Sequence, residues 1–124
     1  NSASELVNHA MRGSIFENWC VTECLKGYLN LGLRPNIYFW KDRKSEVDLL
    51  LEHGSRELLA LECKSGKTLQ PQFINNALGL REIMDDKEVK AGVVFGGHES
   101  RKLGDKSFYS WQELADSVFE FLIA

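Results

Sequence analysis

The sequence contains few cysteines, no long apolar run and no excess of positive charge, and each absence excludes a class of protein. No apolar segment approaches the roughly 20 residues that cross a bilayer, and no signal peptide stands at the start, so we expect no membrane association. The three cysteines are an odd number that does not suggest a disulfide framework, which favours a reducing cytoplasm. The 15 basic residues are outnumbered by 18 acidic ones, which counts against a domain that binds nucleic acid strongly by itself.

Two further absences concern the organisation of the chain. The 124 residues contain no repeat, no low-complexity segment and no internal linker, which indicates one domain. They also contain no phosphate-binding GxxxxGKS/T motif, so we expect no ATP hydrolysis by this chain. Because the sequence starts at Asn1 and not at Met, we interpret it as an excised fragment or a processed product, with residues 1–12 as lead-in or cloning remnants and 13–124 as the domain.

Apolar periodicity and turn residues predict an α/β fold with the element order αβββαβα. The predicted segments are a helix over 14–31, strands over 37–40, 46–52 and 57–65, a helix over 71–85, a strand over 91–97, a loop over 98–109 and a last helix over 110–122. Gly32 is a stop signal after the first helix, whereas Pro71 and Ser110 start the later helices. The crossover between the third and fourth strands should be right-handed, and these two strands should be parallel. The result is a central mixed sheet flanked by helices.

The most informative pattern is Asp48, then thirteen residues, then Glu62-Cys63-Lys64. Side chains alternate along a strand, so Glu62 and Lys64 point to the same face. A turn over 54–56 places Asp48 directly opposite Glu62, and a turn over 53–55 makes the two acids diagonal neighbours. A two-residue turn would put them on opposite faces, so we predict a three-residue loop or a bulge.

These residue types suit a metal site beside a phosphodiester. Mg²⁺ or Mn²⁺ prefers hard oxygen ligands, which Asp48, Glu62, the Cys63 carbonyl and waters can supply. Lys64 can orient the attacking water or neutralise the charge that develops on the phosphate. The alternative is an exposed strand face on which Glu62 and Lys64 are merely solvated.

Glu17 is a fourth candidate, because it falls within the apolar stripe of the first predicted helix. A carboxylate on that side is costly unless a partner compensates for its burial. Either Ser14 and Glu17 form a local capping box, or the helix crosses the sheet and brings Glu17 to the metal site. Both interpretations remain open at this point.

Other residues carry weaker signals. Contacts to a nucleic-acid backbone are predicted for Lys41, Arg43, Ser65, Lys67 and Gln72, although such residues are more often solvated loop. A further basic group, Arg101, Lys102 and Lys106, has the same alternative.

Two short motifs have a functional and a structural interpretation. The Gly96-Gly97-His98 segment can line a phosphate or form a simple turn. Cys20 and Cys24 lie one helical turn apart, but no partner pair of Cys or His has ligand spacing, which favours core residues over a zinc site.

Four segments in order carry a resemblance to a known family: GSIFENWCVTECLK, YFWKDRKSEVDLLLE, LECKSGKTL and VVFGG. They closely resemble the C-terminal domain of bacterial and archaeal AAA-type ATPases. That domain is catalogued as of unknown function and is placed in the PD-(D/E)xK, restriction-endonuclease-like superfamily. The resemblance extends from about Gly13 to Trp111 and implies a restriction-endonuclease-like core.

The resemblance also implies roles and partners. Asp48 looks like the metal-binding aspartate of the superfamily, Glu62 and Lys64 look like its (D/E)xK pair, and Glu17 looks like the acid on its first helix. Val47 departs from the proline of the pattern. The implied function is a nuclease-like domain that uses Mg²⁺ or Mn²⁺ and is joined to an upstream AAA-type ATPase. The alternative is an inactive interaction or regulatory module of that ATPase.

Overall fold

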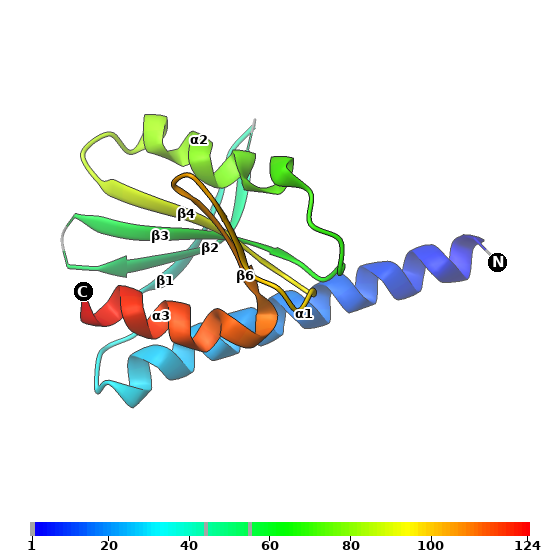
Figure 1. Ribbon diagram of the computed structural model, residues 1–124, viewed down its shortest axis with the longest axis horizontal. Helices are drawn as coiled ribbons and strands as arrows, with labels where there is room; N and C mark the ends of the chain where they lie inside the picture. Colours follow the sequence, from blue (N-terminus) through cyan, green and yellow to red (C-terminus); the bar gives the residue numbers. More distant parts are fainter. Residues whose placement is uncertain (1, 44, 55) are drawn as a thin grey trace.

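Six strands form one mixed sheet in the computed structural model, which describes residues 2–43, 45–54 and 56–124 (Figure 1). The helices are α1 (Ser2–Asn30), α2 (Asn75–Ile83) and α3 (Leu114–Ile123), with short 3-10 turns at Pro71–Ile74 and Trp111–Glu113. The strands are β1 (Ile37–Lys41), β2 (Glu46–His53), β3 (Glu57–Lys64), β4 (Glu88–Phe95), β5 (Arg101–Leu103) and β6 (Lys106–Ser110). Their order in the sheet is β1-β2-β3-β4-β6-β5.

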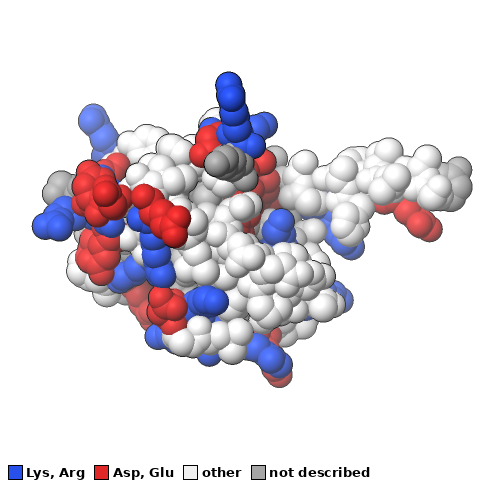
Figure 2. All heavy atoms as spheres, turned by 90° about the horizontal axis from the view of Figure 1, so that it is seen from above, with Lys and Arg blue, Asp and Glu red and all other residues white. Residues whose placement is uncertain are grey.

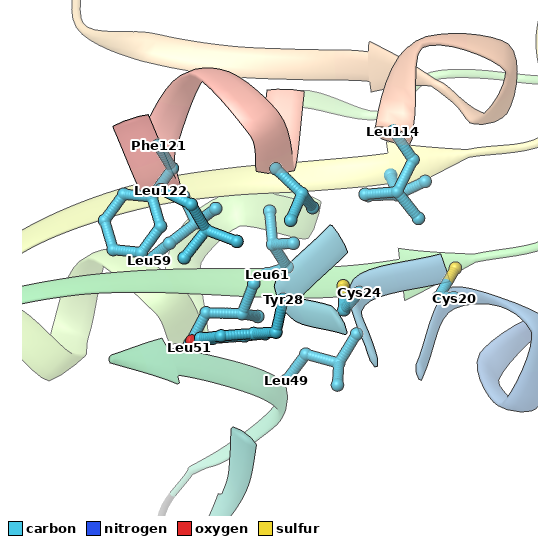
Figure 3. Packing of buried hydrophobic residues seen from close by; sticks show 12 residues of the cluster. Cys20, Cys24, Tyr28, Leu49, Leu51, Leu59, Leu61, Leu114, Phe121 and Leu122 are labelled. Atoms are coloured by element: carbon cyan, nitrogen blue, oxygen red, sulfur yellow. The ribbon is translucent and has the colours of Figure 1, made fainter. Parts of the chain in front are cut away.

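Helices cover both faces of the sheet, as an α/β fold requires. Helices α1 and α3 lie side by side on one face and α2 lies on the other (Figure 1). Each face has its own apolar core, and Figure 3 shows side chains of α1 pointing between the sheet and α3. Cys20 and Cys24 are fully buried there, so the prediction that they belong to the core is confirmed.

The end of α1 follows the predicted signal. Gly32 adopts a φ of 70°, which a residue with a side chain rarely adopts. The amide of Gly32 donates to the Leu29 carbonyl at 3.0 Å, and that of Leu33 donates to the Tyr28 carbonyl at 2.9 Å. This pair of bonds is a Schellman motif, which satisfies carbonyls that the helix end would leave unpaired.

The β2–β3 hairpin has the register that the acidic pattern needs. Its paired residues run from Leu49 opposite Leu61 to His53 opposite Glu57. Three positions separate the ends of the two strands, of which position 55 lies outside the described residues. Continuation of the register places position 48 opposite 62. Strands β3 and β4, which are connected through α2, are parallel, also as predicted.

Three sequence predictions need correction. Helix α1 begins at Ser2, well before the predicted start at Ser14. Strand β4 begins at Glu88, before the predicted start at 91. The segment 98–109, predicted as a loop, contains β5 and most of β6, so the element order is αβββαβββα. All three residues of β5 are exposed, which leaves no alternation of apolar and polar residues to reveal the strand.

The first half of α1 extends beyond the sheet (Figure 1). Its surface is mainly neutral in the space-filling view (Figure 2), and its exposed apolar residues include Leu6, Val7, Met11 and Ile15. Within the described part of the chain, no helix has both the length and the apolar character that a bilayer crossing needs.

Two glycines after β4 hold a neighbouring loop in place. The amide of Gly96 donates to the carbonyls of Lys64 at 3.1 Å and Gly66 at 2.8 Å. A Cβ added at Gly96 would lie 2.2 Å from the Ser65 carbonyl oxygen, and one at Gly97 would lie 2.9 Å from the Lys67 carbonyl oxygen. These distances leave no room for a side chain. The two glycines therefore position the loop that follows Lys64.

We predict that Gly96→Ala destabilises the protein by about 2–4 kcal/mol, because the methyl group collides with backbone that cannot rotate away. Gly79→Ala is the matched control: Gly79 is exposed in α2, and an added Cβ meets no atom within 4 Å. That change should stabilise the protein by about 0.5–1 kcal/mol through helix propensity. Chemical denaturation of both variants measures the difference, and equal stabilities would contradict the packing argument.

Candidate functional site

A cleft of about 600 Å³ lies where α1 crosses the end of the β2–β3 hairpin. Helix α1 contributes His9, Ala10, Gly13, Ser14 and Glu17 to its wall. The strands contribute Asp48, Cys63 and Lys64, and the following segment contributes Ser65, Gly66, Lys67, Thr68, Gln70 and Phe73. The cleft therefore unites residues from three separate parts of the sequence.

Asp48 lies where β2 and β3 separate. The last paired residues of the ladder on this side are Leu49 and Leu61. Beyond them, the amide of Cys63 donates to Oδ2 of Asp48 at 2.8 Å. The carboxylate thus satisfies a backbone donor that the neighbouring strand leaves unpaired, which fixes Asp48 beside β3.

Glu62 is the buried acid of the site. Only 3% of its surface is exposed, and its Oε1 atom is buried without a hydrogen-bond partner. Burial, followed by the charge of Asp48 and a hydrogen bond with Asp48, raises the pKa of Glu62 to about 8. The positive charge of Lys64 acts in the opposite direction. A charged carboxylate with an unused oxygen beside a second carboxylate is unfavourable here, so Glu62 either holds a proton or needs a cation beside it.

Lys64 lies on the same face as Glu62, as strand alternation predicts. Its Nζ atom stands 5.3 Å from the centre of the Phe73 ring, which allows a cation–π contact. Phe73 belongs to the 3-10 turn before α2 and thereby helps to hold the ammonium group at the cleft wall.

Glu17 reaches the cleft from α1. Its pKa is raised by partial burial first and then by the charges of Asp48 and Glu46, while Lys64 lowers it. Ser14 lies inside the continuous helix α1, so it does not cap a helix end and the capping-box explanation is wrong. The position of Glu17 instead follows from α1 crossing the sheet. Glu46, at the start of β2, is an additional acid that the sequence reasoning missed.

The donor set fits a divalent cation with few protein ligands. Asp48 and Cys63 line the cleft, and Glu62 lies behind Asp48 without being among the described residues of the wall. Two carboxyl groups and the backbone carbonyl of Cys63 are hard oxygen donors, which is the ligand chemistry of Mg²⁺ or Mn²⁺. No group of three or more His, Cys, Asp or Glu side chains in described residues is arranged to hold a metal ion. The fit therefore rests on two carboxylates and a carbonyl, with Glu17 at the rim.

The predicted nucleic-acid contacts are divided between the cleft and other surfaces. Ser65 and Lys67 line the cleft. The described residues that line the cleft do not include Lys41, Arg43 or Gln72. Lys41 ends β1, Arg43 lies in the following turn, and the Gln72 amide donates to Oε1 of Gln70 at 2.8 Å.

Sequence reasoning also missed part of the α1 wall. His9, Ala10 and Gly13 precede Glu17 by eight, seven and four positions. These spacings place all four on one side of a helix. Extension of the Glu17 stripe towards the N-terminus would have identified them, but the weak apolar pattern before Ser14 predicted no helix there.

Comparison with known proteins gives one match. A family model described as a domain of unknown function (DUF4143) matches residues 12–114. No curated protein and no solved structure matches the chain.

The buried carboxyl predicts a pH-dependent stability in the presence of a chelator. The folded-state pKa of Glu62, about 8, exceeds its ordinary value of 4.5. The contribution of the protonated Glu62 carboxyl to the free energy of unfolding is therefore fully present below about pH 4.5 and is lost as the pH rises to about 8. We expect Glu62→Gln to be more stable than the wild type at pH 8, by on the order of 2–4 kcal/mol, and nearly equal to it at pH 4.5.

Thermal or urea denaturation of both proteins at the two pH values measures this effect. Glu57→Gln, at the opposite end of the same strand, is the control for the loss of one carboxylate. A difference between wild type and Glu62→Gln that does not change with pH would show that Glu62 is not the responsible group.

Proposed function

The chain belongs to the DUF4143 family of domains of unknown function, and we propose that it is a metal-dependent nuclease-like domain that hydrolyses phosphodiesters of DNA or RNA. One observation carries this proposal: the nearly buried Glu62 has an unpartnered oxygen beside Asp48, with Lys64 on the same face of the sheet. Two acids and a lysine at the end of a hairpin are the side chains that a restriction-endonuclease-like site needs. The resemblance adds an AAA-type ATPase as the proposed partner domain.

Each residue has a proposed task. Asp48 and Glu62 would hold Mg²⁺ or Mn²⁺ together with the Cys63 carbonyl, and Glu17 would complete the site at its rim. The ion, when bound, would acidify a water molecule and withdraw charge from a phosphate oxygen. Lys64 would orient the attacking water and offset the negative charge of the transition state. Ser65 and Lys67, from the loop held by Gly96, would contact the phosphates on either side.

The negative total charge limits this function. A net charge of −3 gives little general attraction to a nucleic acid. Lys64 and Lys67 provide positive charge at the cleft itself, where a phosphodiester would bind. We therefore expect local recognition at the cleft and weak overall affinity of the domain for nucleic acid.

A non-catalytic interaction module is the second candidate, and an exposed apolar stripe favours it. Val7, Met11, Ile15, Leu25 and Leu29 are between 38% and 66% exposed, and helical spacing places them on one side of α1. Asn18 and Thr22 interrupt this side between Ile15 and Leu25, and exposed apolar groups of this kind are typical of surfaces that bind another protein. In this case the acids of the cleft would be remnants that bind no metal.

Calorimetric titration with Mn²⁺ separates the two candidates. We predict saturable binding by the wild type and at least a tenfold loss of affinity in Asp48→Asn, because that change removes one anionic ligand. Glu82→Gln, on the exposed surface of α2, is the control. Absence of binding by the wild type, both with and without a short oligonucleotide, would favour the interaction module.

Cleavage assays then test the role assigned to the lysine. Lys64→Ala should retain Mn²⁺ binding but lower the cleavage rate of a labelled oligonucleotide by about 10²–10³, because charge stabilisation in the transition state is lost. Lys90→Ala removes a lysine from an exposed position of β4 and should cleave at the wild-type rate. Equal rates for both variants would exclude Lys64 from the reaction.

A further inference from the structure

A second cavity, of about 400 Å³, adjoins the proposed catalytic cleft. It lies between the segment 67–71 and the residues that run from the end of β4 into β5. Its volume is within the range of roughly 300–1,000 Å³ that pockets for small organic ligands occupy. The residue tasks proposed above do not involve this cavity, apart from Lys67.

The segment 67–71 forms a ridge between the two cavities. Lys67 lines both of them. Thr68 and Gln70 line only the catalytic cleft, whereas Leu69 and Pro71 line only the second cavity. A polymer chain that crosses this ridge would therefore touch both cavities and pass Lys67 on the way.

The second cavity combines positive charge with apolar surface. Lys67 and Arg101 approach it from opposite walls, and His98 lies at its side. Leu69, Pro71 and the 47% exposed Leu103 provide the apolar part. A nucleotide has the complementary parts, an anionic phosphate and a planar base with apolar faces. Arginine is especially suited to the phosphate because its planar group donates two hydrogen bonds at once.

Glu99, the one acid among the described residues of this cavity, fits the same ligand. Glu99 would repel a phosphate, so the phosphate is expected nearer to Lys67 and Arg101 than to Glu99. A carboxylate accepts hydrogen bonds from the amino groups of adenine, cytosine or guanine. A phosphate bound by Lys67 and Arg101 and a base amino group bound by Glu99 can therefore belong to one nucleotide.

The walls of the cavity are held in position without a ligand. The Ser110 hydroxyl is buried and donates to the Gly97 carbonyl at 2.7 Å, and the Ser110 amide donates to the Ser100 Oγ atom at 2.8 Å. The close approach of Gly97 to the Lys67 carbonyl connects this wall to the ridge. Binding to a pocket that is already formed costs less conformational entropy, because fewer side chains and loops must become ordered.

We propose that the second cavity binds one unpaired nucleotide of the substrate strand, next to the scissile phosphate. This inference rests on the function proposed above. A base that enters this cavity cannot remain stacked and paired within a duplex, so the substrate is single-stranded, or unpaired, at this position. Arg101 binds the phosphate of that nucleotide, and Leu103 contacts its base.

The test uses the full 124-residue chain and fluorescein-labelled oligonucleotides of about 12 nucleotides, with a chelator present so that binding is measured without cleavage. We expect Arg101→Ala to weaken binding of the single strand by about 5–20-fold and to reduce the dependence of log affinity on log salt by about 1. Lys102→Ala is the matched control, because Lys102 is the next residue of β5 and does not line the cavity. Its affinity should change less than about twofold.

A neutral variant tests the base contact. Leu103→Ala should weaken binding several-fold while the salt dependence stays unchanged, because a lost base contact removes no charge. A blunt duplex of the same length should compete poorly with the single strand. Melting temperatures close to that of the wild type would show that all three variants fold.

Several results would overturn the proposal: equal effects of Arg101→Ala and Lys102→Ala, equal binding of duplex and single strand, or no binding of either probe. The test also separates this pocket from the proposed hydrolysis. Arg101-dependent binding without Mn²⁺-dependent cleavage would support the pocket and contradict the nuclease. Cleavage by the wild type, with Arg101→Ala unchanged in binding and rate, would support the nuclease and contradict the pocket.

Discussion

The hydrogen bond from the Cys63 amide to Asp48 is the interaction on which the geometry of the cleft depends. It forms where β2 and β3 separate, so a side chain replaces the neighbouring strand as hydrogen-bond acceptor. At this end of the two strands, α1 crosses the sheet and brings Glu17 to the cleft. Without the carboxylate at position 48, a partly buried backbone donor would lose its partner, which costs up to about 1–3 kcal/mol. Asp48 is therefore a structural as well as a candidate functional residue.

Glu62, unlike Asp48, is placed where its side chain disfavours folding. It sits at the end of a strand whose preceding residues, from Leu58 to Leu61, are apolar and buried. An apolar residue would suit this position better for folding, because burial raises the pKa of Glu62 and leaves one oxygen unpaired. A local conflict of this kind between burial and charge is typical of functional sites. The fold tolerates it because strong apolar packing surrounds the strand on both faces.

The sequence predicted those parts of the fold that depend on local patterns. The hairpin register follows from the alternation in β2 and β3, and the end of α1 follows from Gly32. The β5–β6 hairpin could not be predicted in this way, because β5 is short and exposed and pairs only with its neighbour β6. For the site, Asp48, Glu62 and Lys64 were accessible from spacing. Glu46 stands two residues before Asp48 on β2, so the same alternation could have identified it. The proximity of the α1 residues to these acids depends on how the helix crosses the sheet, which spacing alone does not reveal.

The continuous course of α1 has a mechanical consequence. A helix of 29 residues is roughly 43 Å long, at a rise of about 1.5 Å per residue, and is stiff over that length. One half is anchored by Cys20, Cys24 and Tyr28 in the core, and the other half projects from the body (Figure 1). The cleft residues from His9 to Glu17 lie between the anchor and the projecting end. A load on the projecting end would therefore reach Glu17 through a stiff helix before it reaches the anchored core.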